Sequence, residues 1–338
     1  MLRYRFALAA LALIGAASAF AQAPPVAPDL LRKNLVAIGG GRRMNIVCLG
    51  RGTPTVLFEY GLGSHLLHWQ KVAQPVATMT RACFYDRAGY GFSDPSPRPM
   101  TAEAVTDDLH ALLRSAGIAG PLVLVGHSLG GLYATLYTDR FPSEVAGLVL
   151  IDPSFAGQRP PDWSADEDRR VQEEFDRGQA ALRACADLAR AGKLTEADPQ
   201  GCFQLEQGRT PQEVAWLMQQ FLKPWRYESA ISEAQSHFAV GKTTSVDDLE
   251  EEQAQRLFGD RPVIVLTAGI DHPDPHVSPQ TQQVFDRFWK AGHDRLAARS
   301  TRGISIVVPQ AAHFIQLDEP QAVIDAIRTV VDDVRRSR

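Results

Sequence analysis

The sequence has little net charge and few long apolar runs. Its 338 residues carry 35 Lys and Arg against 39 Asp and Glu, a formal net charge of −4. No basic excess favours nucleic acid as a partner. No internal repeat or low-complexity segment argues for a solenoid or a disordered chain. With 45% hydrophobic residues, the chain can bury a large core, so one compact domain with an insertion fits its length.

The one apolar run that resembles a membrane segment lies at the N-terminus. Two arginines precede residues 6–14, which are apolar, and small residues at Ala19 and Ala21 offer cleavage positions. The run is too short for a lasting transmembrane anchor, and this arrangement is typical of a secretory signal peptide. We therefore predict a signal peptide over residues 1–21, with Ala19 as the second choice of cleavage site, and a periplasmic or secreted mature chain.

A serine between two glycines follows an apolar run and precedes a helical pattern. Residues 122–125 are Leu-Val-Leu-Val, and Gly126, Ser128 and Gly130 then form a G-x-S-x-G motif. This order predicts a strand, a sharp turn and a helix, with glycines where strand and helix approach closely. The turn would expose the Ser128 hydroxyl as a nucleophile. It would also place the Leu129 N–H at a helix N-terminus, where it can stabilise an oxyanion.

A serine nucleophile needs a general base, which in this architecture follows the serine and the acid in chain order. Residues 304–308 are predicted as the last strand, and His313 stands on the loop after it. His313 is therefore the predicted base. His127 belongs to the turn itself and is better suited to local packing, while His65 and His68 lie near the loop that should hold the oxyanion.

Two aspartates are candidates for the acid that orients the base. Asp152 ends the apolar run 147–151, and Asp271 follows the apolar run 263–270. Either can hold the imidazole tautomer and stabilise the imidazolium. Asp152 is slightly preferred because residues 271–276 are rich in turn formers. That segment also contains two histidines and two aspartates, but their spacing matches no familiar metal site, and no metal is predicted.

The second oxyanion donor is expected on the loop after an early strand. Residues 55–60 are predicted to form that strand, and Gly-Leu-Gly-Ser follows at 61–64. The Leu62 N–H is the predicted donor. A plain glycine-rich turn is the other explanation of this segment.

The chain resembles the α/β-hydrolase superfamily, in particular its single-domain, esterase-like members with a helical cap. The resemblance implies an α/β fold with a mostly parallel central sheet, helices on both faces and an inserted helical cap. Tyr60 stands where a histidine often precedes the oxyanion glycine, and no clear G-x-x-D follows the seventh strand. Because members carry the acid after strand six or seven, Asp152 and Asp271 both stay open. The resemblance rests on residues 58–64, 85–93, 126–131, 148–153 and 313–316.

The pattern of elements divides the chain. Strand-like runs alternate with helical patterns in residues 22–152 and 262–338, the predicted catalytic domain, whereas 153–261 shows only helices and is the predicted cap. Capping-box patterns at 164–167 and 210–213 predict the starts of two of the cap helices. A cap over the serine should supply an apolar pocket wall. The first residues to inspect there are Trp216, Leu217, Phe221, Trp225, Tyr227 and Phe238.

The four cysteines permit disulfides if the chain is exported. Cys185 and Cys202 flank a short polar segment, and their pairing is favoured. It would contribute roughly 3 kcal/mol in the chain-entropy model. Cys48 and Cys83 fall on strands that the resemblance makes neighbours. A disulfide between them is plausible, and two buried free thiols are nearly as plausible.

These observations predict an exported serine hydrolase that cleaves a carboxylic ester or related acyl compound through a Ser-His-Asp triad and an acyl-enzyme. No cofactor is predicted, and the expected partner is a small-molecule substrate, not nucleic acid. Lactonase, thioesterase, amidase or perhydrolase activity would use the same triad. The alternative from another class is a ligand-binding or signalling protein on a hydrolase scaffold. Epoxide hydrolases and dehalogenases are disfavoured because the nucleophile is Ser and not Asp.

Overall fold

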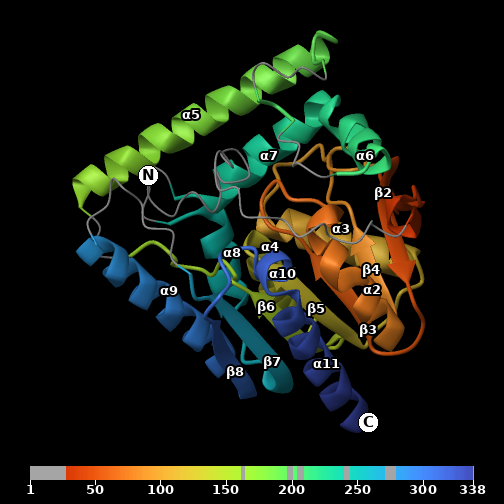
Figure 1. Ribbon diagram of the computed structural model, residues 1–338, viewed down its shortest axis with the longest axis vertical. Coiled ribbons are helices and arrows are strands. Elements are labelled where there is room, and N and C mark those ends of the chain that lie inside the picture. The colour runs from red at the N-terminus through yellow and green to blue at the C-terminus, as the bar shows by residue number, and fades with distance from the viewer. Residues whose placement is uncertain are drawn as a thin grey trace.

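The computed structural model describes residues 28–160, 164–195, 201–203, 209–239, 244–270 and 279–337. The predicted signal peptide and Asp271 lie outside these residues. Figure 1 shows a central sheet with helices on its two faces and a group of helices at one end.

Eight strands form one sheet in the order β1-β2-β4-β3-β5-β6-β7-β8. β1 pairs antiparallel with β2, and β2 pairs antiparallel with β4, whereas every other neighbouring pair is parallel. The mostly parallel sheet predicted from the sequence is therefore confirmed. The strands are β1 (Leu35–Gly39), β2 (Arg42–Leu49), β3 (Thr55–Glu59), β4 (Ala82–Tyr85), β5 (Leu122–His127), β6 (Val145–Ile151), β7 (Gly259–Ala268) and β8 (Ser300–Val308).

Both faces of the central strands are covered, which explains why these strands are continuous apolar runs. In β5, Val123 and Val125 join one core cluster while Leu122 and Leu124 join the other, because successive side chains point to opposite faces. The first cluster includes residues of α2 (Gln70–Met79) and α11 (Pro320–Arg336), and the second includes residues of α3 (Ala102–Ser115), α4 (Leu129–Arg140) and α9 (Pro279–Ala298). Short helices complete the fold: η1 (Pro28–Leu31), η2 (Leu66–Trp69) and α10 (Ile315–Asp318).

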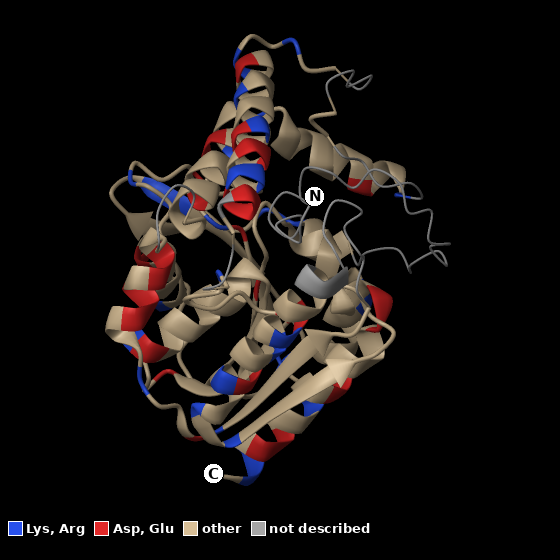
Figure 2. Ribbon diagram, turned by 90° about the vertical axis from the view of Figure 1, so that its left-hand side faces the viewer, with Lys and Arg blue, Asp and Glu red and all other residues tan. Residues whose placement is uncertain are grey.

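Between β6 and β7 the described residues form helices and no strands. Both predicted capping boxes are present, Ser164 with Glu167 at the start of α5 and Thr210 with Glu213 at the start of α6. α5 packs against α7, and α8 packs against α3 and α4 as well as α7. Figure 2 shows charges of both signs along the outermost helix, α5. The four helices are α5 (Ala165–Arg190), α6 (Pro211–Phe221), α7 (Pro224–His237) and α8 (Val246–Ala254).

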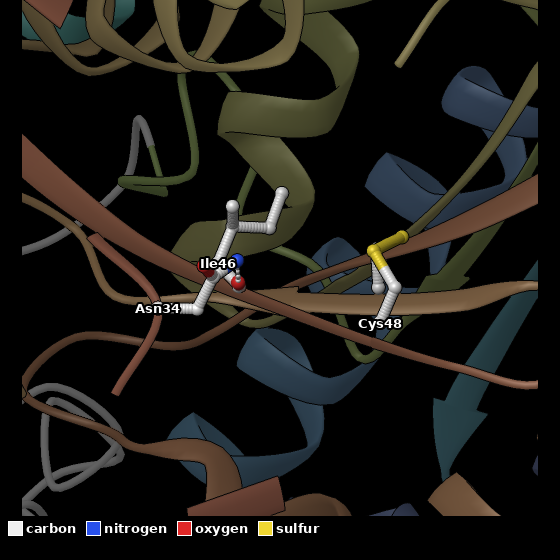
Figure 3. The surroundings of a disulfide bond; sticks show 4 residues. Asn34, Ile46 and Cys48 are labelled. Carbon is white, nitrogen blue, oxygen red and sulfur yellow. Dashed lines mark hydrogen bonds between the residues drawn. A yellow bond between two sulfur atoms is a disulfide. The ribbon is translucent and has the colours of Figure 1, made fainter. Parts of the chain in front are cut away.

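Two disulfides link the cysteines. Cys185 of α5 is bonded to Cys202, the pairing favoured from the sequence. Cys48 is bonded to Cys83, directly opposite it in the antiparallel pair β2 and β4, which decides the question that the sequence left open. Figure 3 shows Cys48 near Ile46 on β2. The side-chain amide of Asn34 donates a hydrogen bond to the Ile46 carbonyl oxygen at 2.8 Å.

None of the helices in the described part of the chain is both long enough and apolar enough to cross a membrane.

Candidate active site

The turn between β5 and α4 has the strained geometry that the G-x-S-x-G motif predicts. Ser128 lies between the last residue of the strand and the first of the helix, with φ 55°. A Cβ on Gly126 would stand 2.4 Å from the Gly130 carbonyl oxygen, and a Cβ on Gly130 would stand 2.5 Å from the Glu59 carbonyl oxygen. Strand, helix and the end of β3 therefore meet too closely for any side chain at either glycine.

The predicted oxyanion donors lie on two segments that touch at Ser128. Leu129 is the first residue of α4, so its N–H has no acceptor within the helix. Gly61 lies so close to the nucleophile that a Cβ on it would stand 3.2 Å from the Ser128 Cβ. Leu62 is the next residue on that loop. The fold thus brings both predicted donor segments to the serine.

His313 and Asp152 are joined directly. The His313 Nδ1–H donates to Asp152 Oδ2 at 2.7 Å, and both side chains are buried. The other carboxylate oxygen accepts hydrogen bonds from the Ala268 N–H and the Trp289 indole, each at 3.1 Å. Burial by itself would raise the pKa of Asp152, but the hydrogen bond and charge of His313, aided by His293, lower it. The carboxylate is therefore held ionised and fixed in orientation.

His127 connects the serine turn to the loop of His313. Its Nε2–H donates to the His313 carbonyl oxygen at 3.0 Å, and the two rings lie 4.6 Å apart, centroid to centroid. Burial strongly lowers the pKa of His127, so the ring is neutral. The ring thus links the serine turn to the backbone of His313, 186 positions further along the chain.

Two residues of α9 that support the acid were not predicted. Trp289 donates to Asp152, and His293, one helical turn later, bonds the Pro153 carbonyl at 3.0 Å and the Thr267 hydroxyl at 2.7 Å. An i, i+4 pair within a helix is ordinarily read as core packing. No pattern in the sequence distinguishes these residues from other core positions, because their partners lie between 26 and 140 positions away in the chain.

Aromatic residues gather around the loop that follows β3. The rings of His65 and His68 stack with centroids 4.2 Å apart. His65 also meets Trp216 of α6 at 6.1 Å, and His68 meets Phe314, the neighbour of His313, at 5.1 Å. Trp216, which the sequence places in the predicted cap, therefore lies next to the predicted oxyanion loop.

Within the described ranges, no group of three or more His, Cys, Asp or Glu side chains is arranged to hold a metal ion. Asp271, the alternative acid, lies outside the described residues. So do the histidines and aspartates of residues 271–276, for which a metal site was disfavoured.

The sequence matches a known family over most of its length. A sequence profile of the alpha/beta hydrolase fold matches residues 54–320. The chain therefore belongs to the α/β-hydrolase family, as the sequence motifs predicted.

Some individual relatives cover only part of the chain. Lipase LipV of Mycobacterium tuberculosis is 38% identical over 105 residues, which are 31% of this chain and 39% of LipV. The first three curated relatives are matched over only 14% to 16% of their own length.

Solved structures agree on the fold. An esterase from Thermogutta terrifontis superposes with a TM-score of 0.57 at 21% identity, covering 90% of this chain and 99% of the esterase. The haloalkane dehalogenase DatA from Agrobacterium tumefaciens superposes with a TM-score of 0.62 at 16% identity, covering 90% and 97%. Proteins of this shape therefore act on more than one kind of bond, so the activity has to be argued from the site.

Proposed function

We propose that this protein is an exported serine hydrolase that cleaves a carboxylic ester or related acyl compound of modest size. The observation that carries the proposal is the His313–Asp152 hydrogen bond at 2.7 Å, on loops that meet the strained turn of Ser128. A nucleophile, a base and a buried acid in this order are the parts that acyl transfer requires.

In the proposed reaction, Ser128 Oγ attacks the carbonyl carbon while His313 Nε2 takes the hydroxyl proton. The Leu62 and Leu129 N–H groups stabilise the oxyanion of the tetrahedral intermediate. Asp152 stabilises the imidazolium, which then protonates the departing alcohol. Water attacks the acyl-enzyme with His313 again as base, releasing the carboxylate and restoring Ser128.

The serine favours one of the chemistries found among the structural neighbours. A hydroxyl nucleophile with its own base suits attack on a carbonyl carbon, whereas dehalogenases and epoxide hydrolases of this superfamily are expected to use an Asp nucleophile. Ser128 therefore favours ester or acyl hydrolysis over dehalogenation. The cap, proposed to span residues 153–261 between the catalytic segments 22–152 and 262–338, would supply Trp216 as part of the pocket wall.

Export is part of the proposal because both disulfides fit an oxidising compartment. N-terminal sequencing of the protein recovered from a periplasmic or culture fraction would test it. A chain that begins after residue 21 is expected, and an intact N-terminus in the cytoplasmic fraction would contradict it.

Hydrolysis of p-nitrophenyl acetate, butyrate and octanoate by wild type and Ser128→Ala tests the activity. The variant should lose kcat by at least about 10⁴-fold while its Tm stays unchanged. If wild type and Ser128→Ala hydrolysed each of the three esters at the same rate, the esterase proposal would be overturned. Amides and lactones would then be assayed for the same triad, hydrogen peroxide for perhydrolysis, and retention of a slowly turned-over ligand for the binding alternative.

A further inference from the structure

Arg87 holds two consecutive carbonyl groups of the predicted oxyanion loop. Its Nη1 donates to the Tyr60 carbonyl oxygen at 2.6 Å, and its Nη2 donates to the Gly61 carbonyl oxygen at 2.8 Å. The side chain is only 2% exposed. The guanidinium is rigid and planar, so two bonds from one group fix the path of the backbone as it leaves β3.

The bond to Gly61 determines where the Leu62 N–H points. A trans peptide unit is planar, with its C=O and N–H directed to opposite sides. The Gly61 carbonyl and the Leu62 N–H belong to the same unit, so holding the carbonyl toward Arg87 turns the N–H away from Arg87. The Gly61 carbonyl also accepts the Ser64 N–H at 3.2 Å, which closes the loop into a tight turn.

The charge of Arg87 is balanced from two regions of the molecule. Glu59 of β3 accepts from Nη1 at 2.8 Å, and Glu233 of the cap helix α7 accepts from Nε at 2.7 Å. Glu233 is fully buried and also accepts the Tyr90 hydroxyl at 2.6 Å. A buried guanidinium without such partners would be strongly destabilised. Glu233 thus helps to keep Arg87 under the loop.

α7 reaches the same loop a second time. Arg226, two helical turns before Glu233, donates from Nη2 to the Gly63 carbonyl oxygen at 2.8 Å. Its guanidinium also lies over the rings of Tyr90 and Phe221, 5.1 and 4.9 Å from their centroids, which restricts its position. One cap helix therefore holds the carbonyl groups on both sides of Leu62, Gly61 through Arg87 and Gly63 directly.

We propose that helix α7 of the cap sets the geometry of the oxyanion hole: Glu233 through Arg87, and Arg226 through the Gly63 carbonyl, fix the loop so that the Leu62 N–H points toward the reacting carbonyl. The three side chains are positioning residues and touch no reacting atom. The inference rests on the proposed function, since it assigns a role to the cap in that same reaction.

The test compares Arg226→Gln, Arg226→Lys and Glu233→Gln with a matched control. Arg190 of α5 forms an ion pair with Glu228 of α7 on the surface of the molecule. Like Arg226, it is an arginine that connects α7 to another segment, but it lies away from the loop. Arg190→Gln should leave kcat and KM within twofold of wild type. Arg226→Gln should lower kcat by about 10- to 100-fold, approaching the loss of one oxyanion donor, with KM changed less than threefold. Arg226→Lys keeps a donor and should recover part of the rate.

A second readout separates oxyanion geometry from general damage. n-Butylboronic acid forms a tetrahedral adduct with the serine and needs the oxyanion hole, so its inhibition constant should rise in Arg226→Gln by about the factor by which kcat falls. The inference would be overturned if Arg226→Gln raised KM and left kcat unchanged. It would also be overturned if a folded variant bound the boronate as tightly as wild type does. If Glu233→Gln does not fold, the Arg226 variants decide. Wild-type hydrolysis that does not depend on Ser128 would instead overturn the proposed function itself.

Discussion

The sheet and the helices between β6 and β7, which form the proposed cap, are built by different physical means. The central strands bury apolar side chains on both faces, so burial of apolar surface stabilises them. α5 of the cap carries acidic residues in its first turn and charges of both signs along its length, and relies on a capping box and the Cys185–Cys202 disulfide. The difference teaches that burial on two faces stabilises the central strands, whereas α5 adds local devices, a capping box and a disulfide, to its packing against the rest of the molecule.

The two regions also divide the proposed chemistry. Ser128, Asp152 and His313 follow β5, β6 and β8, where the carboxyl ends of parallel strands meet at one edge of the sheet. The cap provides none of these groups. It reaches the predicted oxyanion loop through buried contacts, directly through Arg226 and indirectly through Glu233 and Arg87.

The largest expected effects come from breaking the core contribution. His313→Ala should lower kcat by at least about 10⁴-fold, and Asp152→Asn by about 10⁴-fold, because the amide no longer stabilises the correct imidazole tautomer. Steady-state ester hydrolysis measures both. Asp271→Asn is the control and should stay within a few-fold of wild type. A greater loss in Asp271→Asn than in Asp152→Asn would make Asp271 the acid.

Removing each disulfide sharpens the comparison in terms of stability. Replacing Cys48 and Cys83 by Ser should reduce the free energy of unfolding by about 4 kcal/mol, and replacing Cys185 and Cys202 by about 3 kcal/mol, since the closed loops span 35 and 17 residues. Urea unfolding followed by fluorescence and by activity measures them. In the cap variant, activity should disappear before the core unfolds, and coincident transitions would show that cap and core unfold as one unit.

Acid should selectively weaken the core contact between Asp152 and His313. Because the pKa of Asp152 is lowered in the folded protein, its stabilising contribution is complete above the ordinary Asp pKa and is lost as pH falls below it. The stability difference between wild type and Asp152→Asn should therefore shrink by on the order of 2 kcal/mol between pH 6 and pH 2.5. Urea unfolding at several pH values checks this, and a constant difference would contradict it.

The smallest effect is expected from one capping residue in the cap. Thr210→Ala removes the acceptor for the Glu213 N–H and should cost about 1 kcal/mol, confined to α6. Hydrogen exchange of the α6 amides measures it, with Thr210→Ser as the variant that keeps the cap. Faster exchange throughout the sheet would show that the cap is not locally stabilised.

Much of the core could be predicted because its signals are local. The apolar run before Ser128, the glycines around it and the loop position of His313 indicated the fold, which the structure and the family match confirm. The choice between Asp152 and Asp271 could not be made, because each follows an apolar run and the sequence does not say which loop bends toward His313. In the structure, Asp152 contacts His313.

The sequence by itself determined most of the strands, the serine turn, the helix starts at Ser164 and Thr210 and the α/β-hydrolase membership, since backbone propensity and hydrophobic periodicity act over a few residues. Only the tertiary structure decided the contacts between distant segments. Arg87 and Glu233 are 146 positions apart, yet they meet beneath the Leu62 loop. The sequence around neither residue indicates this contact. Such pairs depend on how packed elements bring buried charges together, and that is a property of the whole fold.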